Sequence, residues 1–407
     1  MNFDRMRALL LEQAIRGELV PQLDSEGVVE QMRDAPEEIP FEIPEKWKWA
    51  SLKVLVERTK QTIPEEEFTY IDVASIENFQ VRATKKVKAS EAPSRARKIA
   101  EAGMVLFATV RPYLKNICIV PNIEGSVIAS TAFATMICTK HLDNKYLLYV
   151  LRSDFFTDLV KGKQRGISYP AISDKDFYSL SIPVPPIEEQ KRIVAKLEKV
   201  FAEIDRAEKA YQELQTLSDA LTKQILQKAI HGRLVPQLKG ESLPSGIKEV
   251  KDSSFEIPET WRLTSLGDLI SMKSGDGLSK KQYMPGTIPV YGGNGVNGYH
   301  NSSNVEEGTL VIGRVGYYCG NVKKTTEAAW VTDNALIVNF KIEANPDFYL
   351  YILNGMNLGK KTNQTAQPVI TGKLLKPMLV PVPPLEEQQR IVTKIEELFK
   401  QVEALKA

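Results

Sequence analysis

AIRGELVPQL at residues 14–23 recurs as AIHGRLVPQL at residues 229–238, and this repeat determines how the chain is organised. A second pair closes each copy, since PVPPIEEQ at 183–190 recurs as PVPPLEEQ at 381–388. The offset between the copies falls from 215 residues in the first pair to 198 in the second. We infer that one ancestral unit is used twice and that small deletions have shortened the second copy.

The segments between these flanks keep a common pattern and little identity. FEIPE, one further residue and a tryptophan begin each interior, with the tryptophans at Trp47 and Trp261. Spaced matches also link Gly103, Tyr113 and Asn116 to Gly308, Tyr318 and Asn321 at an offset of 205. Constant flanks around diverged interiors indicate that the flanks do a common job and the interiors different ones.

A helix is expected after each PVPP run. Proline fixes φ and lacks an N–H, so the run itself is not helix interior, and the glutamates that follow suit a first helical turn. After the first run, apolar residues recur every three or four positions until a stop signal at Gly232 and Pro236. We predict one helix over residues 187–231, about 68 Å long at roughly 1.5 Å per residue.

The other copy of this helix is divided between the two ends of the chain. Residues 385–407 match its first half and residues 1–16 match its second half, so that positions 210–215 alone lack a counterpart. We expect the two terminal helices to stack nearly end to end and to pack antiparallel against the central helix. The result is a coiled-coil scaffold with circular pseudo-two-fold symmetry.

The two interiors are each long enough to hold a core of their own. Apolar runs at 105–108, 132–137, 310–313 and 335–338 predict buried strands, and the segments around 145–160 and 347–359 predict helices. The predicted fold is therefore α/β (α+β), with two similar mixed domains. The expected boundaries are an N-terminal helical segment 1–23, a first interior 24–183, a central region 184–238, a second interior 239–381 and a C-terminal helix 382–407.

Composition and motifs exclude several classes of function. Lys and Arg number 53 against 51 Asp and Glu, so the net charge of +2 neither favours nor excludes nucleic acid. Cys118, Cys138 and Cys319 have no metal or disulfide spacing, which fits a reducing, cytoplasmic location. No stretch approaches the roughly 20 apolar residues of a membrane span, so no membrane partner is expected. Phosphate-binding loops, dinucleotide motifs and metal-ligand spacings are missing, so we assign no catalytic residue, metal or cofactor to this chain.

Both interiors contain cationic, amide and aromatic residues suited to DNA. Lys and Arg engage phosphates, while Arg, Asn and Gln can bond base edges. In the first interior the candidates are Arg82, Lys85, Lys86, Lys88, Arg111, Tyr113, Lys115, Lys163, Gln164, Arg165 and Tyr169. In the second interior they are Lys273, Lys280, Lys281, Tyr291, Asn294, Arg314, Tyr317, Lys360, Lys361, Asn363 and Gln364. The glycine-rich segment 291–295 is expected to be a loop. Each basic cluster alone could be a solvated face, but their recurrence at matching positions favours DNA.

The paired PVPP-[IL]-EEQ-x-RIV, AI-x-G-x-LVPQL and FEIPE-x-W segments resemble the specificity subunit of type I restriction–modification systems, over essentially the whole chain. The resemblance implies that each interior is a target recognition domain that reads one half of a bipartite site in double-stranded DNA. The paired helices then set the length of the unread spacer.

The same resemblance implies the partners. Two modification subunits would dock on the helices and methylate adenine with S-adenosylmethionine, and restriction subunits would cleave with ATP and Mg. None of these cofactors is expected on this chain, which would be non-catalytic. The helical candidates for partner binding are Glu188, Glu189, Gln190, Arg192, Glu386, Glu387, Gln388 and Arg390.

Three alternatives stay open at this point. The chain could be an interaction scaffold with two binding domains and no role on DNA. It could be an enzyme, although no motif supports one. It could also serve a related methyltransferase that has no restriction partner.

Overall fold

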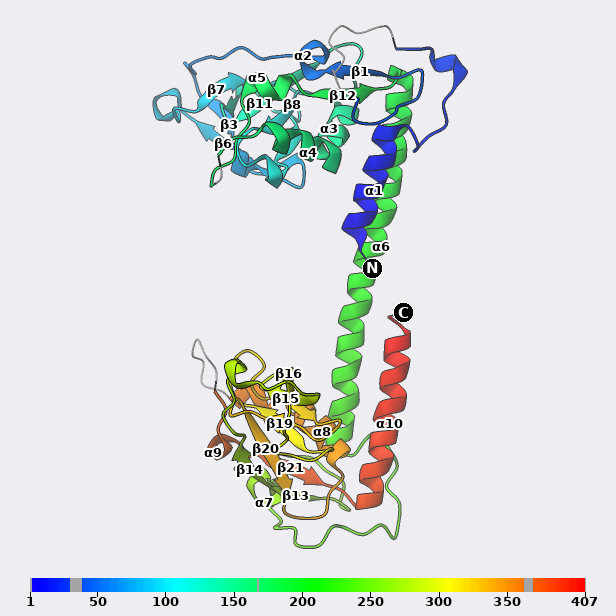
Figure 1. Ribbon diagram of the computed structural model, residues 1–407, viewed down its shortest axis with the longest axis vertical. Helices are drawn as coiled ribbons and strands as arrows, with labels where there is room; N and C mark the ends of the chain where they lie inside the picture. The colour runs from blue at the N-terminus through cyan, green and yellow to red at the C-terminus, as the bar shows by residue number, and fades with distance from the viewer. Residues whose placement is uncertain (1, 30–38, 167, 362–368, 407) are drawn as a thin grey trace. The chain divides into compact units, whose positions relative to one another are not determined.

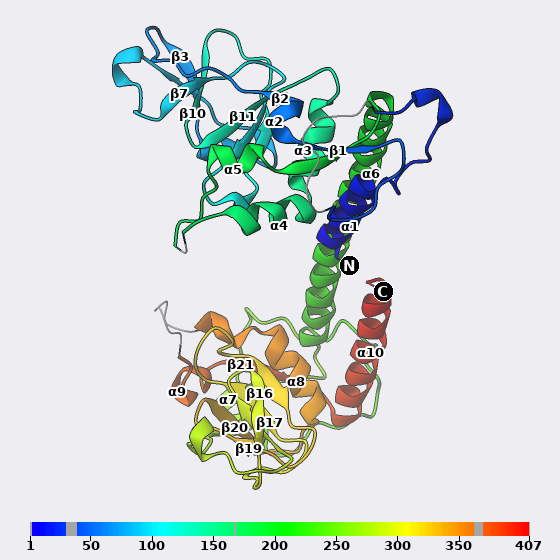
Figure 2. The same ribbon diagram turned by 45° about the horizontal axis from the view of Figure 1, so that its top comes forward.

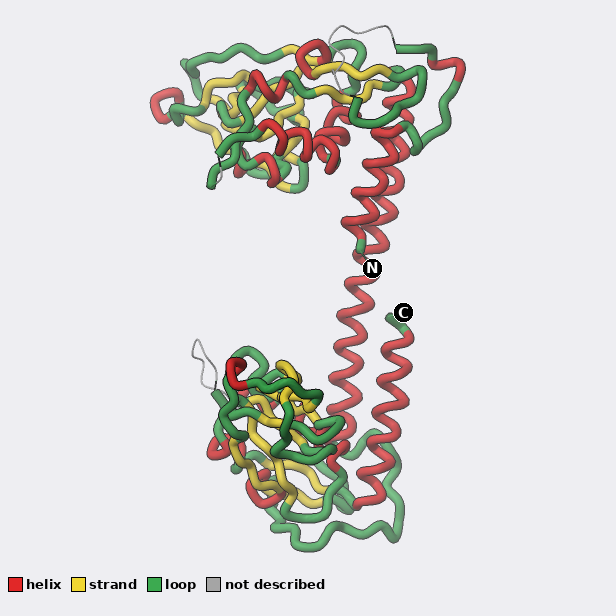
Figure 3. The backbone as a smooth tube through the Cα atoms, in the orientation of Figure 1, coloured by secondary structure: helices red, strands yellow, loops and turns green. Residues whose placement is uncertain are grey.

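The computed structural model describes residues 2–29, 39–166, 168–361 and 369–406. They form two compact units, Met1–Ala210 (unit 1) and Tyr211–Ala407 (unit 2). In each unit the strands gather in one globular part and a pair of helices runs beside it (Figure 1, Figure 3). The mixed α/β class predicted for both interiors is confirmed.

The central helix α6 spans Ile187–Ile230 and matches the predicted range to within one residue. It begins directly after two prolines and ends before Gly232, whose φ of +64° favours glycine. With 44 residues it is about 66 Å long at 1.5 Å per residue. Its residues up to 210 belong to unit 1 and the rest to unit 2.

In unit 1, helix α1 (Phe3–Arg16) lies along the first part of α6 (Figure 1, Figure 2). Asn2 caps its N-terminus by accepting from the Arg5 N–H, and Gly17 ends it with φ +77°. Arg7 pairs with Asp205 and Glu208 at 2.6 Å each. Since the far end of α1 meets the start of α6, the two helices are antiparallel, as predicted.

In unit 2, helix α10 (Leu385–Ala404) lies along the second part of α6. Near its start, Arg390 donates to the Pro236 carbonyl at 3.0 Å, just beyond the end of α6. Near its end, the pKa of Lys406 is raised, first by its hydrogen bond to Glu403 and also by the negative charge of Asp219, which lies in the first turns of that second part. The predicted antiparallel packing is thus confirmed in each unit, while the end-to-end stacking of α1 and α10 stays a prediction.

The first interior holds two four-stranded sheets. One has the order β2 (Val56–Glu57), β11 (Phe133–Cys138), β8 (Val105–Ala108), β9 (Ile117–Ile119). The other has the order β6 (Lys85–Val87), β3 (Phe68–Ile71), β10 (Val127–Ser130), β7 (Ala96–Ile99). A short hairpin, β4 (Ile76–Glu77) and β5 (Gln80–Val81), follows β3. The helices are α2 (Leu52–Leu55), α3 (Asn144–Arg152), α4 (Asp154–Lys163) and α5 (Asp174–Tyr178).

The second interior has a similar plan with fewer strands. One sheet has the order β14 (Ile270–Ser274), β20 (Ala335–Phe340), β17 (Leu310–Gly313), β18 (Val322–Lys324). The other has the order β16 (Gly295–His300), β15 (Ile288–Gly292), β19 (Trp330–Val331). Its helices are α7 (Leu266–Leu269), α8 (Pro346–Gly355) and α9 (Gly372–Leu375), with a short η6 turn (Leu358–Lys361).

The glycine-rich segment 291–295 is not the loop that we expected. Gly292 pairs with Gly295 across a two-residue turn, so the segment is the tip of the β15–β16 hairpin. Gly293 and Asn294 form the turn, and Gly295 follows it at the start of β16 with a positive φ of +102°, which glycine adopts without strain. The glycines therefore serve a hairpin rather than an open loop.

The first and last strands of each interior lie side by side. The strand that follows FEIPE-x-W pairs antiparallel with the strand that contains the first prolines of PVPP: β1 (Lys48–Ser51) with β12 (Ser181–Val184) in unit 1, and β13 (Arg262–Ser265) with β21 (Leu379–Val382) in unit 2. The sheets are two-stranded, which suits strands with a proline that cannot donate. Each interior is thus closed at the point where its helix starts.

None of the helices in the described part of the chain is apolar over enough residues to cross a bilayer.

Candidate nucleic-acid interface

A buried glutamate lies at the closure point of each unit. In unit 1, Glu189 accepts from Trp47 Nε1 at 3.1 Å and from Gln22 Nε2 at 2.5 Å. In unit 2, Glu387 accepts from Trp261 Nε1 at 2.9 Å and from Gln237 Nε2 at 2.7 Å. Both carboxylates are only 1% exposed. Burial raises the pKa of both carboxyls, and the bonds from the tryptophan and the glutamine act against that rise.

The next residue of each helix binds the interior through its side-chain amide. Gln190 donates to the carbonyls of His141 and Pro185 at 2.8 and 2.9 Å. Gln388 donates to the Pro383 carbonyl at 3.0 Å and accepts from the Asn345 N–H at 2.8 Å. The tryptophan, glutamate and two glutamines of each unit, with its left-handed glycine, are called the joint.

The glycine of the joint leaves no room for a side chain. A Cβ on Gly17 would lie 2.4 Å from the Pro44 ring, and one on Gly232 would lie 2.4 Å from the Pro258 ring. The AI-x-G-x-LVPQL segment and the proline of FEIPE-x-W therefore pack directly against each other. This contact explains why the two motifs occur together in both copies.

The joint corrects half of the predicted partner-binding set. Glu189, Gln190, Glu387 and Gln388 are buried and bonded inside their own units, so these side chains offer no surface to a partner. Arg192 and Arg390 form matching ion pairs, with Glu26 at 2.6 Å and Glu241 at 2.7 Å. Glu188 and Glu386 are exposed and remain candidates for partner binding.

In the first interior, the loop after β8 meets the segment before β12. Val110 bridges to Ala171, and the Arg111 N–H donates to the Pro170 carbonyl at 2.8 Å. The Arg111 guanidinium lies 4.9 Å from the ring of Tyr169, which is 73% exposed. Tyr113, on the adjacent η4 turn (Pro112–Leu114), is 50% exposed. Arg111 and Tyr169 are thus brought together, and Tyr113 is exposed two residues further along the chain.

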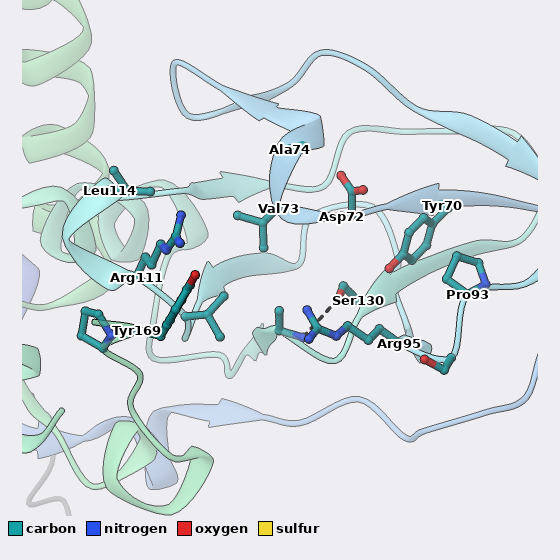
Figure 4. A pocket seen from close by; sticks show the side chains of 14 residues that line it. Tyr70, Asp72, Val73, Ala74, Pro93, Arg95, Arg111, Leu114, Ser130 and Tyr169 are labelled. Atoms are coloured by element: carbon teal, nitrogen blue, oxygen red, sulfur yellow. Dashed lines mark hydrogen bonds between the residues drawn. The ribbon is translucent and has the colours of Figure 1, made fainter. Parts of the chain in front are cut away.

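Beside this loop lies a cavity of about 820 Å³ (Figure 4). Arg111 stands next to Tyr169 on one side, and Arg95 enters from the side of Tyr70 (Figure 4). The residues that line the cavity are Tyr70, Asp72, Val73, Ala74, Pro93, Ser94, Arg95, Val110, Arg111, Leu114, Ser130, Ala132, Tyr169 and Pro170.

The candidates on β6 and its flanks lie at an exposed sheet edge. Lys85 and Lys86 pair across to Tyr70 and Thr69 of β3, and β6 is the outer strand of its sheet. Arg82 and Lys88 are exposed on either side of this strand. Cross-strand partners point to the same face, so Lys85 shares its face with Tyr70 of the cavity.

Other candidates of the first interior are engaged within it. Lys115 pairs with Asp154 at 2.8 Å, and Lys163 donates to the Ser179 hydroxyl at 2.9 Å. Gln164 is partly buried, whereas the Arg165 side chain is 88% exposed. Arg165 lies 4.0 Å from the Asp176 carboxylate, so three of these four cationic or amide side chains already have a partner within the interior.

In the second interior, Asn294 and Tyr317 are exposed, the latter by 91%. Arg314 donates to the Ser274 hydroxyl at 3.3 Å. Lys273 on β14 and Lys280 and Lys281 on the η5 turn (Lys280–Gln282) are exposed as well. Tyr291 is wrong as a contact residue, because it is 5% exposed in a core cluster with Val311 and Val331. The side chains of Lys360 and Lys361 and the residues Asn363 and Gln364 lie outside the described residues.

The basic run Arg95, Arg97 and Lys98 was expected as a segment that could meet DNA, but sequence reasoning singled out none of its members as a candidate. Of this run, Lys98 is buried and donates to the Phe133 carbonyl at 2.6 Å. On β7 the side chains of Ala96 and Lys98 turn inward, while Arg95, just before the strand, lines the cavity. The alternation of buried and exposed positions along the strand was the signal that could have separated these residues.

Within the described ranges, no group of three or more His, Cys, Asp or Glu side chains could hold a metal ion.

Comparison with known proteins gives a consistent result. The family model for the type I restriction modification DNA specificity domain matches twice, at residues 44–216 and 258–407. The specificity subunit of the Escherichia coli type I restriction enzyme EcoAI is 22% identical over 99% of this chain and 90% of its own length. The specificity subunits of EcoprrI and EcoDI, also from Escherichia coli, are 30% and 29% identical, but the matches span only 32% and 30% of their lengths.

Two solved structures resemble this fold. A chain from a structure described as the basis of complex assembly and conformational transition of the type I R-M system has a TM-score of 0.73 and 28% identity, over 90% of this chain and 93% of its own. The HsdS subunit from Thermoanaerobacter tengcongensis has a TM-score of 0.62 and 27% identity, over 90% of this chain and 92% of its own.

Proposed function

The chain belongs to the type I restriction modification DNA specificity family, and from this membership we propose that it selects the DNA sequence for a type I restriction–modification complex. Each interior reads one half of a bipartite site in double-stranded DNA. The chain itself performs no chemistry, and it binds neither S-adenosylmethionine nor ATP.

The observation that carries this proposal is the repeated joint. The same tryptophan, glutamate, glutamines and glycine hold both interiors onto their helices. Beyond the joints, the exposed residues of the two interiors differ, since Arg111 and Tyr169 stand in one, and Asn294 and Tyr317 in the other. Two equivalent joints that hold two interiors with different surfaces suit a protein that reads two different half-sites.

The partners follow from the family. We propose that two modification subunits and the restriction subunits assemble on this chain in the cytoplasm, with Glu188 and Glu386 on the exposed helix surface among the docking residues. Cys118, Cys138 and Cys319 are all free thiols, which supports a reducing compartment.

The proposal is tested by sequencing the methylome of cells that carry this chain with its modification partner. A bipartite motif, in which two short specific parts flank an unread spacer, is the expected result. Cells with the partner alone serve as the control and should lack the motif. Methylation at a single continuous motif, or none that depends on this chain, would contradict the proposal.

The helix α6 belongs to both units, and we propose that its length sets the spacer. An insertion of four residues near Gln212 adds about one turn, or roughly 6 Å, and should lengthen the preferred spacer. If the insertion mutant still prefers sites with the original spacer length, as the wild type does, this proposal is ruled out.

A further inference from the structure

Two arginines in the cavity of the first interior have side chains without polar partners. Among the described residues, neither Arg95 nor Arg111 forms a side-chain hydrogen bond or an ion pair, and the Arg111 guanidinium lies over the Tyr169 ring. By contrast, Arg7 and Arg192 in the same unit are paired with carboxylates at 2.6 Å. Each guanidinium of the cavity therefore offers all five N–H donors to a ligand.

The backbone at Arg111 indicates that its side chain is needed. Arg111 has a φ of +47°, in the left-handed region that favours glycine. The matching position of the second interior, at the offset of 205, is Gly316 with φ +82°. The flanking bridges correspond as well, since Val110–Ala171 matches Val315–Val369. The two loops share one backbone shape, and the first keeps an arginine where glycine would be less strained.

The surroundings of the two arginines suit a base edge better than a lone anion. Among the lining residues Asp72 is the one carboxylate, and its Oδ1 already accepts from the Ser75 N–H and hydroxyl at 3.0 and 2.9 Å. The ring of Tyr169 lies against the Arg111 guanidinium, and such stacking fixes the plane of the fork. Lys85 lies on the same face as Tyr70, where it can meet a phosphate.

A planar fork with free donors matches guanine, whose O6 and N7 both accept in the major groove. Resting on the proposed function, we propose that Arg95 and Arg111 are specificity-determining residues, and that each contacts a guanine in the half-site read by the first interior. The second interior, with Gly316 at the position of Arg111, reads its half-site without this contact.

The experiment compares methylomes of cells that carry the modification partner with wild-type chain, Arg111→Lys or Arg95→Lys. Lysine keeps the charge but loses the two-donor fork. Each variant should lose discrimination at one guanine of one half-site by about ten- to a hundred-fold, with the other half-site unchanged. Lys140→Ala, at an exposed lysine of the same interior outside the cavity, is the matched control and should keep the full motif.

The outcomes separate this proposal from the proposed function. A wild-type chain that gives no bipartite motif defeats the proposed function itself. A wild-type bipartite motif that stays unchanged in the lysine variants, with methylation merely reduced at all sites, defeats base reading and leaves a phosphate contact.

A binding assay covers the case in which a variant accumulates poorly. The purified complex is titrated with duplexes in which each guanine of the half-site is replaced by adenine. The wild type should lose about ten- to a hundred-fold in affinity at the guanine that the arginine contacts, and the variant less than about three-fold at that guanine. Equal losses in wild type and variant at every guanine would overturn the proposal.

Discussion

The two joints consist of the same residue types and make matching hydrogen bonds, whereas the interiors that they hold differ in how they pack. Glu189 and Glu387 accept from the same two residue types, and both are 1% exposed. Elsewhere in the two interiors, at the offset of 202, Arg152 at the end of α3 matches Asn354 on α8. The same place in the two copies is therefore filled by different interactions.

The two residues at this position make different kinds of contact. The Arg152 guanidinium lies 3.8 Å from the Phe79 ring and 5.6 Å from the Phe201 ring of α6. Asn354 instead accepts from the Val322 N–H at 3.0 Å and donates to its carbonyl at 2.9 Å, which holds α8 to β18. Residues stay constant where both copies need the same attachment, and they change where each copy packs against its own interior.

The largest expected effect comes from removing the tryptophan of either joint. Trp47 and Trp261 are 1% and 2% exposed, so each Trp→Ala substitution leaves a large cavity and removes one of the two hydrogen bonds to the buried glutamate. Each should lower the free energy of unfolding of its own unit by about 3–5 kcal/mol. Urea unfolding followed by far-ultraviolet circular dichroism measures this. Losses that differ by more than about 2 kcal/mol between the two variants would show that the joints are not equivalent.

The glycines of the joints give the next effect. Gly17→Ala and Gly232→Ala force a side chain into a left-handed backbone and against a proline ring at 2.4 Å. We expect a loss of at least about 2 kcal/mol for each, since the backbone alone costs about 1–2 kcal/mol. Gly308→Ala is the control for the positive φ, because Gly308 has φ +79° with no atom within 4 Å of its Cβ. A joint variant that loses no more stability than this control would refute the packing argument.

A smaller and unequal effect is expected where the copies differ. Arg152→Ala removes cation–π contacts with three rings, those of Phe79, Tyr149 and Phe201, at about 0.5–2 kcal/mol in all. Asn354→Ala breaks two hydrogen bonds to β18 and leaves the Val322 N–H and carbonyl without these partners, which should cost about 1–3 kcal/mol. Exchanging the residues, Arg152→Asn and Asn354→Arg, should restore neither, because neither site offers the other's partners. Thermal unfolding of the four variants tests this, and full stability of either exchange would contradict the comparison.

Sequence reasoning succeeded where the physical signal is local or repeated. The limits of α6 followed from Pro185, Pro186 and Gly232, and the strands 105–108 and 310–313 followed from apolar runs. It failed where the outcome depends on contacts between distant segments. Glu189 looked like a first-turn acid on a helix surface, and only its approach to Trp47, 142 positions away in sequence, shows that it is buried. Arg95 was not separated from the other cations of its run, because the sequence does not show a cavity that several loops form together.

The smallest effect is a dependence on pH that both joints should share. Burial raises the pKa of Glu189 and Glu387 above the value each has in the unfolded chain, so the folded state binds the proton more tightly. The contribution of each carboxyl to stability is therefore largest below its unfolded pKa. It falls as the pH rises toward the folded pKa and is constant above that.

Glu189→Gln and Glu387→Gln remove the titration, so the difference in unfolding free energy between wild type and variant should change by less than about 1 kcal/mol between about pH 4 and 7. The change should have the same sign in both units: the unfolding free energy of the wild type should fall relative to that of the variant as the pH rises. A difference that grows in favour of the wild type would mean that the bonds from Trp47 and Gln22, or from Trp261 and Gln237, outweigh burial, and the two carboxylates would then act as anchors that need their charge.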